Sequence, residues 1–270
     1  MSEKNVSPDA SHIENAQGPA PSAPTMQPAI TLTPEQYERL FFQPSASQMD
    51  KSREFASRFG NPTLVGLVTF LLVLSPTSWI LMQANNTTTT SLAVLVGPFF
   101  FLGGMGNFVA GLLEWFIGNT FPFVVFASFG GFWLSLGILL NPENAIPSAF
   151  PNGGASAIDF NTGVTFYFIF WSVLCSLYFF ASLRTNVGFA VIFLGLIFGF
   201  VFLAAAYDRV GYGNLDRART YFKVAGAFTF VTCVSGWYLA ASLLLASVNM
   251  PFSLPVGDLS TRFLVKKQRY

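Results

Sequence analysis

The chain has 270 residues, of which 52% are hydrophobic, 17% aromatic and only 10% charged, and its formal net charge is +1. A soluble domain carries about 25% charged residues, so this composition favours a protein embedded in a membrane, and the near-neutral charge gives no reason to expect a nucleic-acid partner. The single histidine lies in a polar segment and both cysteines lie in apolar runs. Because there is also no phosphate-binding loop, we expect no enzyme, no metal site, no cofactor and no ATP-driven pump.

The first 58 residues are polar and hold too few apolar side chains to bury a core. We therefore expect a mostly disordered cytoplasmic tail over 1–58. Within it, Thr33-Pro34-Glu35-Gln36 combines an N-cap, a first-turn proline and a capping box. This pattern predicts a short helix near 34–42.

Six apolar segments follow, which predict an all-α integral membrane protein with six transmembrane helices. The first begins at Asn61-Pro62, where the asparagine side chain can cap the helix and the proline presets φ for the first turn. A helix of about 21 residues rises roughly 31 Å, enough to cross a bilayer core. The expected spans lie at about 62–82, 91–116, 121–140, 162–183, 187–207 and 221–247.

The basic residues predict which side of the membrane holds the termini. Six spans place both termini on one side, and the lysines and arginines just before the first span, together with Arg184 and those after residue 260, predict that this side is cytoplasmic. The transporter domain then covers 59–250, and 251–270 form a cytoplasmic C-terminal tail. One connection disagrees, because this orientation places four basic residues outside: Arg209, Arg217, Arg219 and Lys223.

The stretch from Gly103 to Ser135 holds a carboxylate inside a long apolar region. Gly103, Asn107, Gly111 and Glu114 are spaced by four, four and three residues, which places them on one helix stripe roughly 80° wide. Such a stripe allows a neighbouring helix close and offers it polar groups. Two interpretations stay open: the glutamate marks a helix end at the membrane surface, or the stripe helps to line a solute path.

Two further patterns concern how the helices meet. Asn119 and Thr120 interrupt the apolar region directly after the stripe and predict that the helix ends and the next one begins there. In the fifth span, Gly195 and Gly199 form a small-xxx-small pair. This pair predicts a surface that packs closely against another helix, within the chain or in another copy.

Three motifs resemble those of the acetate uptake transporter family of bacteria and fungi. Residues 61–67, NPTLVGL, are similar to the family's NPAPLGL. Residues 103–114, GGMGNFVAGLLE, are similar to GGxxQxxAGxxE, and residues 118–121 and 128–133, GNTF and SFGGFW, are similar to GNTFG and TSYGxFW. The resemblance covers roughly 55–250 and therefore includes all six expected spans.

The resemblance implies a six-helix protomer that assembles as a homo-hexamer and passes small monocarboxylates through a central path. It places the narrowest point at Phe70, Phe129 and Leu196, which we call the collar. The motif Gln and Glu fall on Asn107 and Glu114. The remaining positions carried over as polar path or motif are Asn61, Pro62, Gly66, Gly111, Asn119, Thr120 and Ser128.

The sequence departs from the family pattern at several of these positions. Leu64 replaces the second proline of the first motif, Pro122 replaces the glycine of GNTFG, and Asn107 replaces glutamine. Phe129 stands where the family has tyrosine, which removes a hydroxyl from the collar and leaves it entirely apolar. The resemblance thus implies the fold more strongly than the identity of the acid.

The collar suggests how an acid would pass. A carboxylate anion loses several kcal/mol on entering an apolar constriction, whereas the protonated acid loses far less. We therefore hypothesise proton-linked or facilitated passage of acetate or another small monocarboxylate across the plasma membrane. Glu114 could be the proton partner, or it could hold a structural network with Asn119 or Thr120.

The sequence leaves two other classes of function open. The same collar would admit ammonia, water or another small neutral solute, and competition by acetate would discriminate this channel from an acid transporter. A non-transporting membrane sensor that signals through the N-terminal tail is the other alternative.

Overall fold

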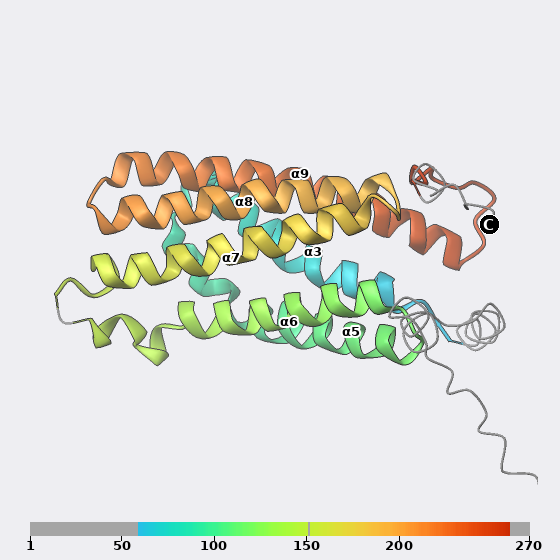
Figure 1. Cartoon of the computed structure of the whole chain (residues 1–270), viewed down its shortest axis with the longest axis horizontal. Helices are drawn as coiled ribbons and strands as arrows, with labels where there is room; N and C mark the ends of the chain where they lie inside the picture. The colour runs from blue at the N-terminus through green and yellow to red at the C-terminus, as the bar shows by residue number, and fades with distance from the viewer. Residues whose placement is uncertain (1–58, 151, 260–270) are drawn as a thin grey trace, which may run out of the picture. The chain divides into compact units, whose positions relative to one another are not determined.

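The computed structural model describes residues 59–150 and 152–259, which form helices joined by short turns (Figure 1). Six helical segments are long and apolar enough to cross a membrane, so the expected all-α class and number of spans are confirmed. The expected tail over 1–58, its helix near 34–42 and residues 260–270 lie outside the described residues. The long helices are α3 (Pro62–Leu81), α5 (Asn107–Phe116), α6 (Thr120–Leu140), α7 (Ile158–Ser182), α8 (Val187–Gly211) and α9 (Leu215–Ser247).

The first span begins as its capping pattern predicts. The Asn61 side chain accepts a hydrogen bond from the Thr63 backbone N–H at 3.0 Å, and Pro62 is the first helical residue. The short connection after it holds the 3₁₀ turn η1 (Ala84–Asn86). The connection between α6 and α7 holds three more such turns, η4 (Pro142–Asn144), η5 (Ile146–Ala149) and η6 (Gly154–Ser156).

The second span is not the uniform α-helix that its apolar run predicts. It passes through a 3₁₀ segment η2 (Thr89–Leu95), a single α-helical turn α4 (Val96–Pro98) and a π-helical segment η3 (Phe99–Gly106) before α5. Pro98 has no N–H to give to the preceding turn, and the glycines of η3 lower the resistance of the backbone to other geometries. Hydropathy reports neither the missing N–H of proline nor the conformational freedom of glycine.

The last three spans extend beyond their apolar windows. α7 begins at Ile158 rather than near 162, α8 ends at Gly211 rather than near 207, and α9 begins at Leu215 rather than near 221. Asn214 caps α9 by accepting from the Arg217 backbone N–H at 3.2 Å. Backbone hydrogen bonding continues through polar residues, so the expected connection over 208–220 is reduced to a tight turn.

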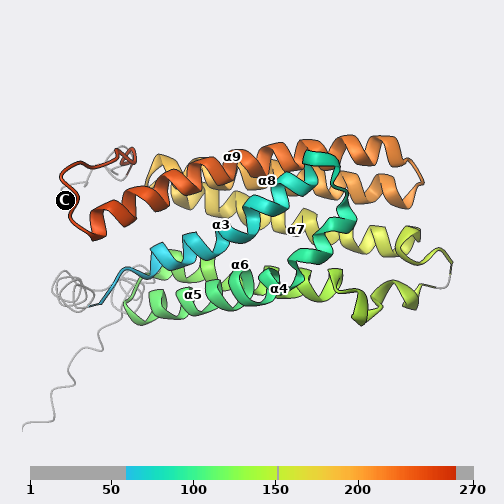
Figure 2. The same ribbon diagram turned by 180° about the vertical axis from the view of Figure 1, so that it is seen from behind.

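The helices pack around a shared interior (Figures 1 and 2). α8 packs along both α7 and α9, α3 packs on α9 and on α5 with η3, and α6 packs on α5 and η3. α6 and α7 meet through side chains: the hydroxyls of Ser135 and Tyr167 lie 2.6 Å apart, and those of Ser128 and Tyr178 3.0 Å apart. Residues from every span therefore reach the interior.

The glycine pair of the fifth span makes a close contact with α9. A Cβ added at Gly195 would lie 2.3 Å from the Thr232 hydroxyl oxygen, and one added at Gly199 would lie 2.8 Å from the Thr229 methyl carbon. Only a hydrogen fits at both positions. The predicted small-residue surface is confirmed as a contact within the chain.

The segment after α9 returns to the connection between α7 and α8. The Val187 N–H donates to the Gly257 carbonyl at 2.9 Å, and the Leu259 N–H donates to the Thr185 carbonyl at 3.0 Å. Tyr238 of α9 also donates its hydroxyl to the Pro255 carbonyl at 2.9 Å. The segment after α9 therefore lies at the same end of the helices as the connection between α7 and α8. An even number of spans requires this arrangement.

Candidate functional site

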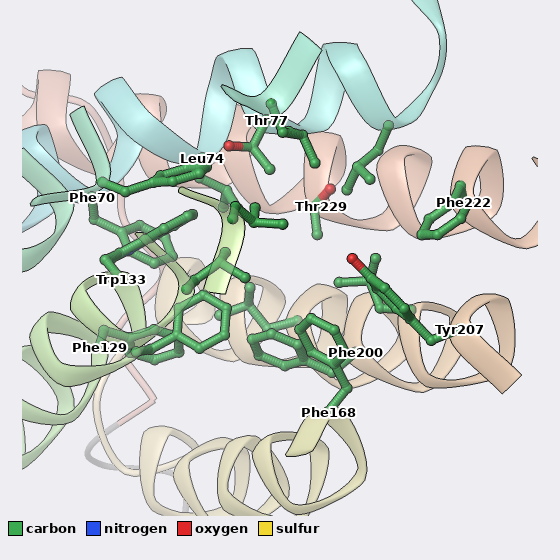
Figure 3. Close-up of a pocket in the computed structure, with 18 residues that line it drawn as sticks. Phe70, Leu74, Thr77, Phe129, Trp133, Phe168, Phe200, Tyr207, Phe222 and Thr229 are labelled. Carbon is green, nitrogen blue, oxygen red and sulfur yellow. The ribbon is translucent and has the colours of Figure 1, made fainter. Parts of the chain in front are cut away.

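A mostly apolar cavity of about 40 Å³ lies inside the helices (Figure 3). Its walls come from α3, η2, η3, α6, α7, α8 and α9. Three hydroxyl-bearing side chains interrupt the apolar lining from three different helices: Thr77, Thr229 and Tyr207. We call it the threonine cavity. It has room for a water-sized molecule, since one water needs about 10–15 Å³ of such space.

A second cavity, of about 20 Å³, lies between α3, α5, α6 and α8. Its lining is apolar except for the amide of Asn107, and we call it the asparagine cavity.

The collar residues Phe70, Phe129 and Leu196 are the described residues that line both cavities. They are 6%, 2% and 1% exposed, respectively. The Phe70 and Phe129 rings meet edge to face, with centroids 5.2 Å apart. The structure thus brings the three side chains together from three spans, at the boundary between the two cavities.

Two buried polar atoms at these cavities have no hydrogen-bond partner among the described residues. Asn107 donates from Nδ2 to the Thr69 hydroxyl at 3.3 Å, but its Oδ1 is unpartnered. The same holds for the Nε1 of Trp133, which is 1% exposed and lines the threonine cavity. An unsatisfied buried group costs about 1–3 kcal/mol, so each is a candidate to bond a passing solute.

Trp133 is a candidate that the apolar pattern of the sequence does not select. Its indole stacks on Phe99 with centroids 5.2 Å apart and lies beside Phe70, at 6.2 Å. A Cβ at Gly103 would lie 2.5 Å from the indole Cγ. Gly103 therefore makes room for Trp133, and the pairing of a motif glycine with a motif tryptophan is the signal that could have pointed to it.

Glu114 is fully buried but lines neither cavity. Its Oε1 accepts from the Thr63 hydroxyl, and its Oε2 accepts from the Asn119 amide at 2.7 Å. The carboxylate thereby joins the start of α3 to the turn between α5 and α6. This geometry favours the structural network, one of the two roles that the sequence leaves open.

The other expected path residues serve packing and helix ends in the described structure. A Cβ at Gly66 would lie 2.6 Å from the Phe126 ring, and one at Gly111 would lie 2.8 Å from the Ala127 nitrogen, so both glycines let α6 approach. Ser128 bonds Tyr178 across α6 and α7. Neither of the two cavities is lined by these positions, nor by Asn61, Pro62, Asn119 or Thr120.

A third cavity, of about 570 Å³, adjoins the threonine cavity, because Phe222 lines both. We call it the vestibule. One wall is formed by the connection after α3, from Gln83 to Thr89, and the other includes the exposed Arg219 and Lys223 of α9. The sequence shows these cations only as an orientation conflict.

Comparison with known proteins places this architecture in a family. The model of the GPR1/FUN34/yaaH family matches residues 42–261. The chain belongs to this family. The family match agrees with both the six spans and the motif resemblance. The chain is therefore a multi-pass membrane protein of a family that includes transporters.

Curated relatives cover most of the chain. Protein alcS of Aspergillus fumigatus is 34% identical over 96% of this chain and 94% of its own length. Acetate permease A of Emericella nidulans is 29% identical over 80% of this chain and 70% of its own length. Ammonia transport outward protein 2 of Saccharomyces cerevisiae is 28% identical over 74% of this chain and 69% of its own length.

The fold is also found among solved structures. The bacterial acetate channel SatP matches with a TM-score of 0.59 and 24% identity, over 74% of this chain and 99% of its own. This likeness supports the arrangement of the six spans.

Proposed function

We propose that the chain passes acetate or a similar small monocarboxylate across a membrane, through the collar and in a proton-linked form. The observation that carries the proposal is that the collar residues line both internal cavities. The names of two similar proteins, an acetate permease and an acetate channel, supply the substrate class.

The chemistry of the lining favours the protonated acid. Moving a carboxylate anion from water into apolar surroundings costs several kcal/mol. No charged side chain lines the threonine cavity or the asparagine cavity to offset this cost. The Thr77 and Thr229 hydroxyls donate to the carbonyls of Val73 and Ala225 in their own helices, at 2.8 and 3.0 Å. Their oxygens remain acceptors, which suits the O–H of an undissociated acid and disfavours an anion.

Asn107 and Trp133 complement this lining on the two sides of the collar. The unpartnered Oδ1 of Asn107 can accept a hydrogen bond from the acid O–H, and the unpartnered Nε1–H of Trp133 can donate one to the acid carbonyl. An acid molecule offers both a donor and an acceptor, whereas acetate offers acceptors alone. Each site thereby offsets part of the desolvation of the acid.

We further propose a homo-hexamer in the plasma membrane, with both termini cytoplasmic, a transporter domain over 59–250 and tails before and after it. The predicted orientation rests on the basic residues at the two ends of the chain. Large apolar side chains point outward from several spans and suit contact with lipid or another protomer, among them Phe101, Trp115, Phe170 and Phe180.

Ammonia is the second candidate substrate, because one relative carries that function in its name. Ammonia is neutral and small, so the same collar would admit it. Competition discriminates the two: unlabelled acetate lowers labelled acetate uptake through an acid transporter, and leaves ammonia flux through a neutral-solute channel unchanged.

The test is flux in proteoliposomes with wild-type protein and a Phe70→Ala variant. Phe70→Ala widens the collar, so we expect the ratio of butyrate to acetate flux to rise several-fold. Phe170→Ala is the matched control, since it removes the same ring from a 71% exposed position on α7. Acetate flux no higher than in empty vesicles, at every proton gradient, would overturn the function, and an unchanged ratio in Phe70→Ala would overturn the role of the collar.

A further inference from the structure

The vestibule places two positive charges at one end of the apolar path. Arg219 and Lys223 are four residues apart on α9, so they share a helix face, and both line the cavity. Neither forms an ion pair within the described residues, where Asp208 is paired with Arg209 at 2.9 Å. Asp216, the other acid of this region, does not line the vestibule.

The vestibule and the threonine cavity share one lining residue. Phe222, between Arg219 and Lys223 in the sequence, lines both the vestibule and the threonine cavity, and the threonine cavity reaches the collar. The opposite wall is polar and uncharged, from Gln83 and the run Asn86–Thr89. A solute that enters from this end therefore meets the cations before it meets the apolar lining.

We propose that the vestibule is a binding site for carboxylate anions, with Arg219 and Lys223 as the cations that hold them. This proposal rests on the proposed function and extends it to the entry step. It also explains the orientation conflict in the sequence: in the proposed topology these cations face outside, against the positive-inside tendency, and a role in capturing the substrate accounts for their position.

The positive potential of Arg219 and Lys223 determines how the vestibule affects the solute. A positive potential concentrates anions and repels protons, so it leaves the local concentration of the neutral acid unchanged. The site instead raises the occupancy of the anion at the entrance, and a bound anion becomes the acid that crosses the collar by taking one proton from a hydronium ion or a buffer acid, which is left as water or as the conjugate base. The same potential repels ammonium and methylammonium.

The probe for this site is benzenesulfonate, a permanent anion larger than acetate. We expect it to inhibit acetate uptake by wild-type protein in proteoliposomes when it is added on both sides, and to lose potency as salt rises. In the double variant Arg219→Gln/Lys223→Gln, we expect inhibition to weaken about twofold or more, since two exposed charges that attract the anion are removed, and the half-saturating acetate concentration to rise.

Arg217→Gln is the matched control. Arg217 lies on the same helix, carries the same charge and is exposed, but it does not line the vestibule, so inhibition should equal that of wild type. Benzyl alcohol serves as the neutral control for the ring. The proposal is overturned if wild-type protein transports acetate but ignores benzenesulfonate, or if the double variant is inhibited as strongly as wild type. Absence of acetate flux in wild-type protein would instead contradict the proposed function.

Discussion

Replacing Glu114 by glutamine separates the two roles that this carboxylate could have. Both carboxylate oxygens accept hydrogen bonds, one from the Thr63 hydroxyl and one from the Asn119 amide at 2.7 Å. Glutamine keeps the shape but offers one acceptor oxygen and one NH₂ group. Its oxygen can still accept from the Asn119 amide and its NH₂ group can donate to the Thr63 hydroxyl oxygen, so the substitution replaces two bonds to a charged group by two neutral bonds at a fully buried side chain.

The expected cost follows from the loss of the charge. A hydrogen bond to a charged group contributes about 1.5–3 kcal/mol and a neutral one about 0.5–1.5 kcal/mol. We therefore expect Glu114→Gln to lower the melting temperature of the purified protein by several degrees. Acetate flux per folded protein, and its dependence on pH, should stay as in wild type, because Glu114 lines neither cavity.

The assay pairs thermal unfolding in detergent with flux in proteoliposomes. Asn119→Ala and the Glu114→Gln/Asn119→Ala double variant complete a cycle, in which the structural role predicts a coupling free energy of about 0.5–3 kcal/mol. The opposite pattern would refute the reasoning: an unchanged melting temperature together with a flattened pH dependence of flux would identify Glu114 as the proton partner.

Three further substitutions and one control test the packing and the two unpartnered atoms. Gly195→Ala should lower the melting temperature, because its Cβ would lie 2.3 Å from the Thr232 hydroxyl oxygen, while Gly131→Ala, with nothing within 4 Å, should leave it unchanged or raise it. Asn107→Leu removes the unpartnered acceptor, and we expect acetate flux to fall about fivefold if that bond contributes about 1 kcal/mol to the barrier. Trp133→Phe keeps an aromatic ring and removes the N–H, so acetate flux per folded protein should fall by a similar factor.

The number of spans and the start of the first one follow from the sequence, because long apolar runs and a cap at Asn61 have direct physical meanings. The ends of α8 and α9 do not follow, since polar residues such as Asp208 and Asp216 continue a helix beyond its apolar window. The π-helical segment η3 follows Pro98 and contains three glycines, and hydropathy does not report the effect of either on backbone geometry.

The site could be predicted only in part. Each span is apolar on nearly all sides, so the periodicity of its hydrophobic residues does not indicate which face points to the interior. The collar residues come from three spans, and no spacing in the sequence predicts that they lie close together. The family resemblance is what predicts it. The sequence does not identify Thr77 and Thr229 as lining a cavity, because an isolated threonine in an apolar helix usually bonds its own backbone, as both do here.

The charged residues of the vestibule help to decide between acetate and ammonium as the solute. A channel for ammonium would gain from carboxylates at its entrance, yet the charged residues that line the vestibule are Arg219 and Lys223, and the buried carboxylate of Glu114 is held by two donors away from both cavities. A cationic mouth leaves neutral ammonia unaffected but repels ammonium, and it attracts the carboxylate that forms most of a weak acid near neutral pH. Neutralising the vestibule should therefore weaken acetate capture and ease the approach of methylammonium, and a change of both affinities in the same direction would contradict an electrostatic role.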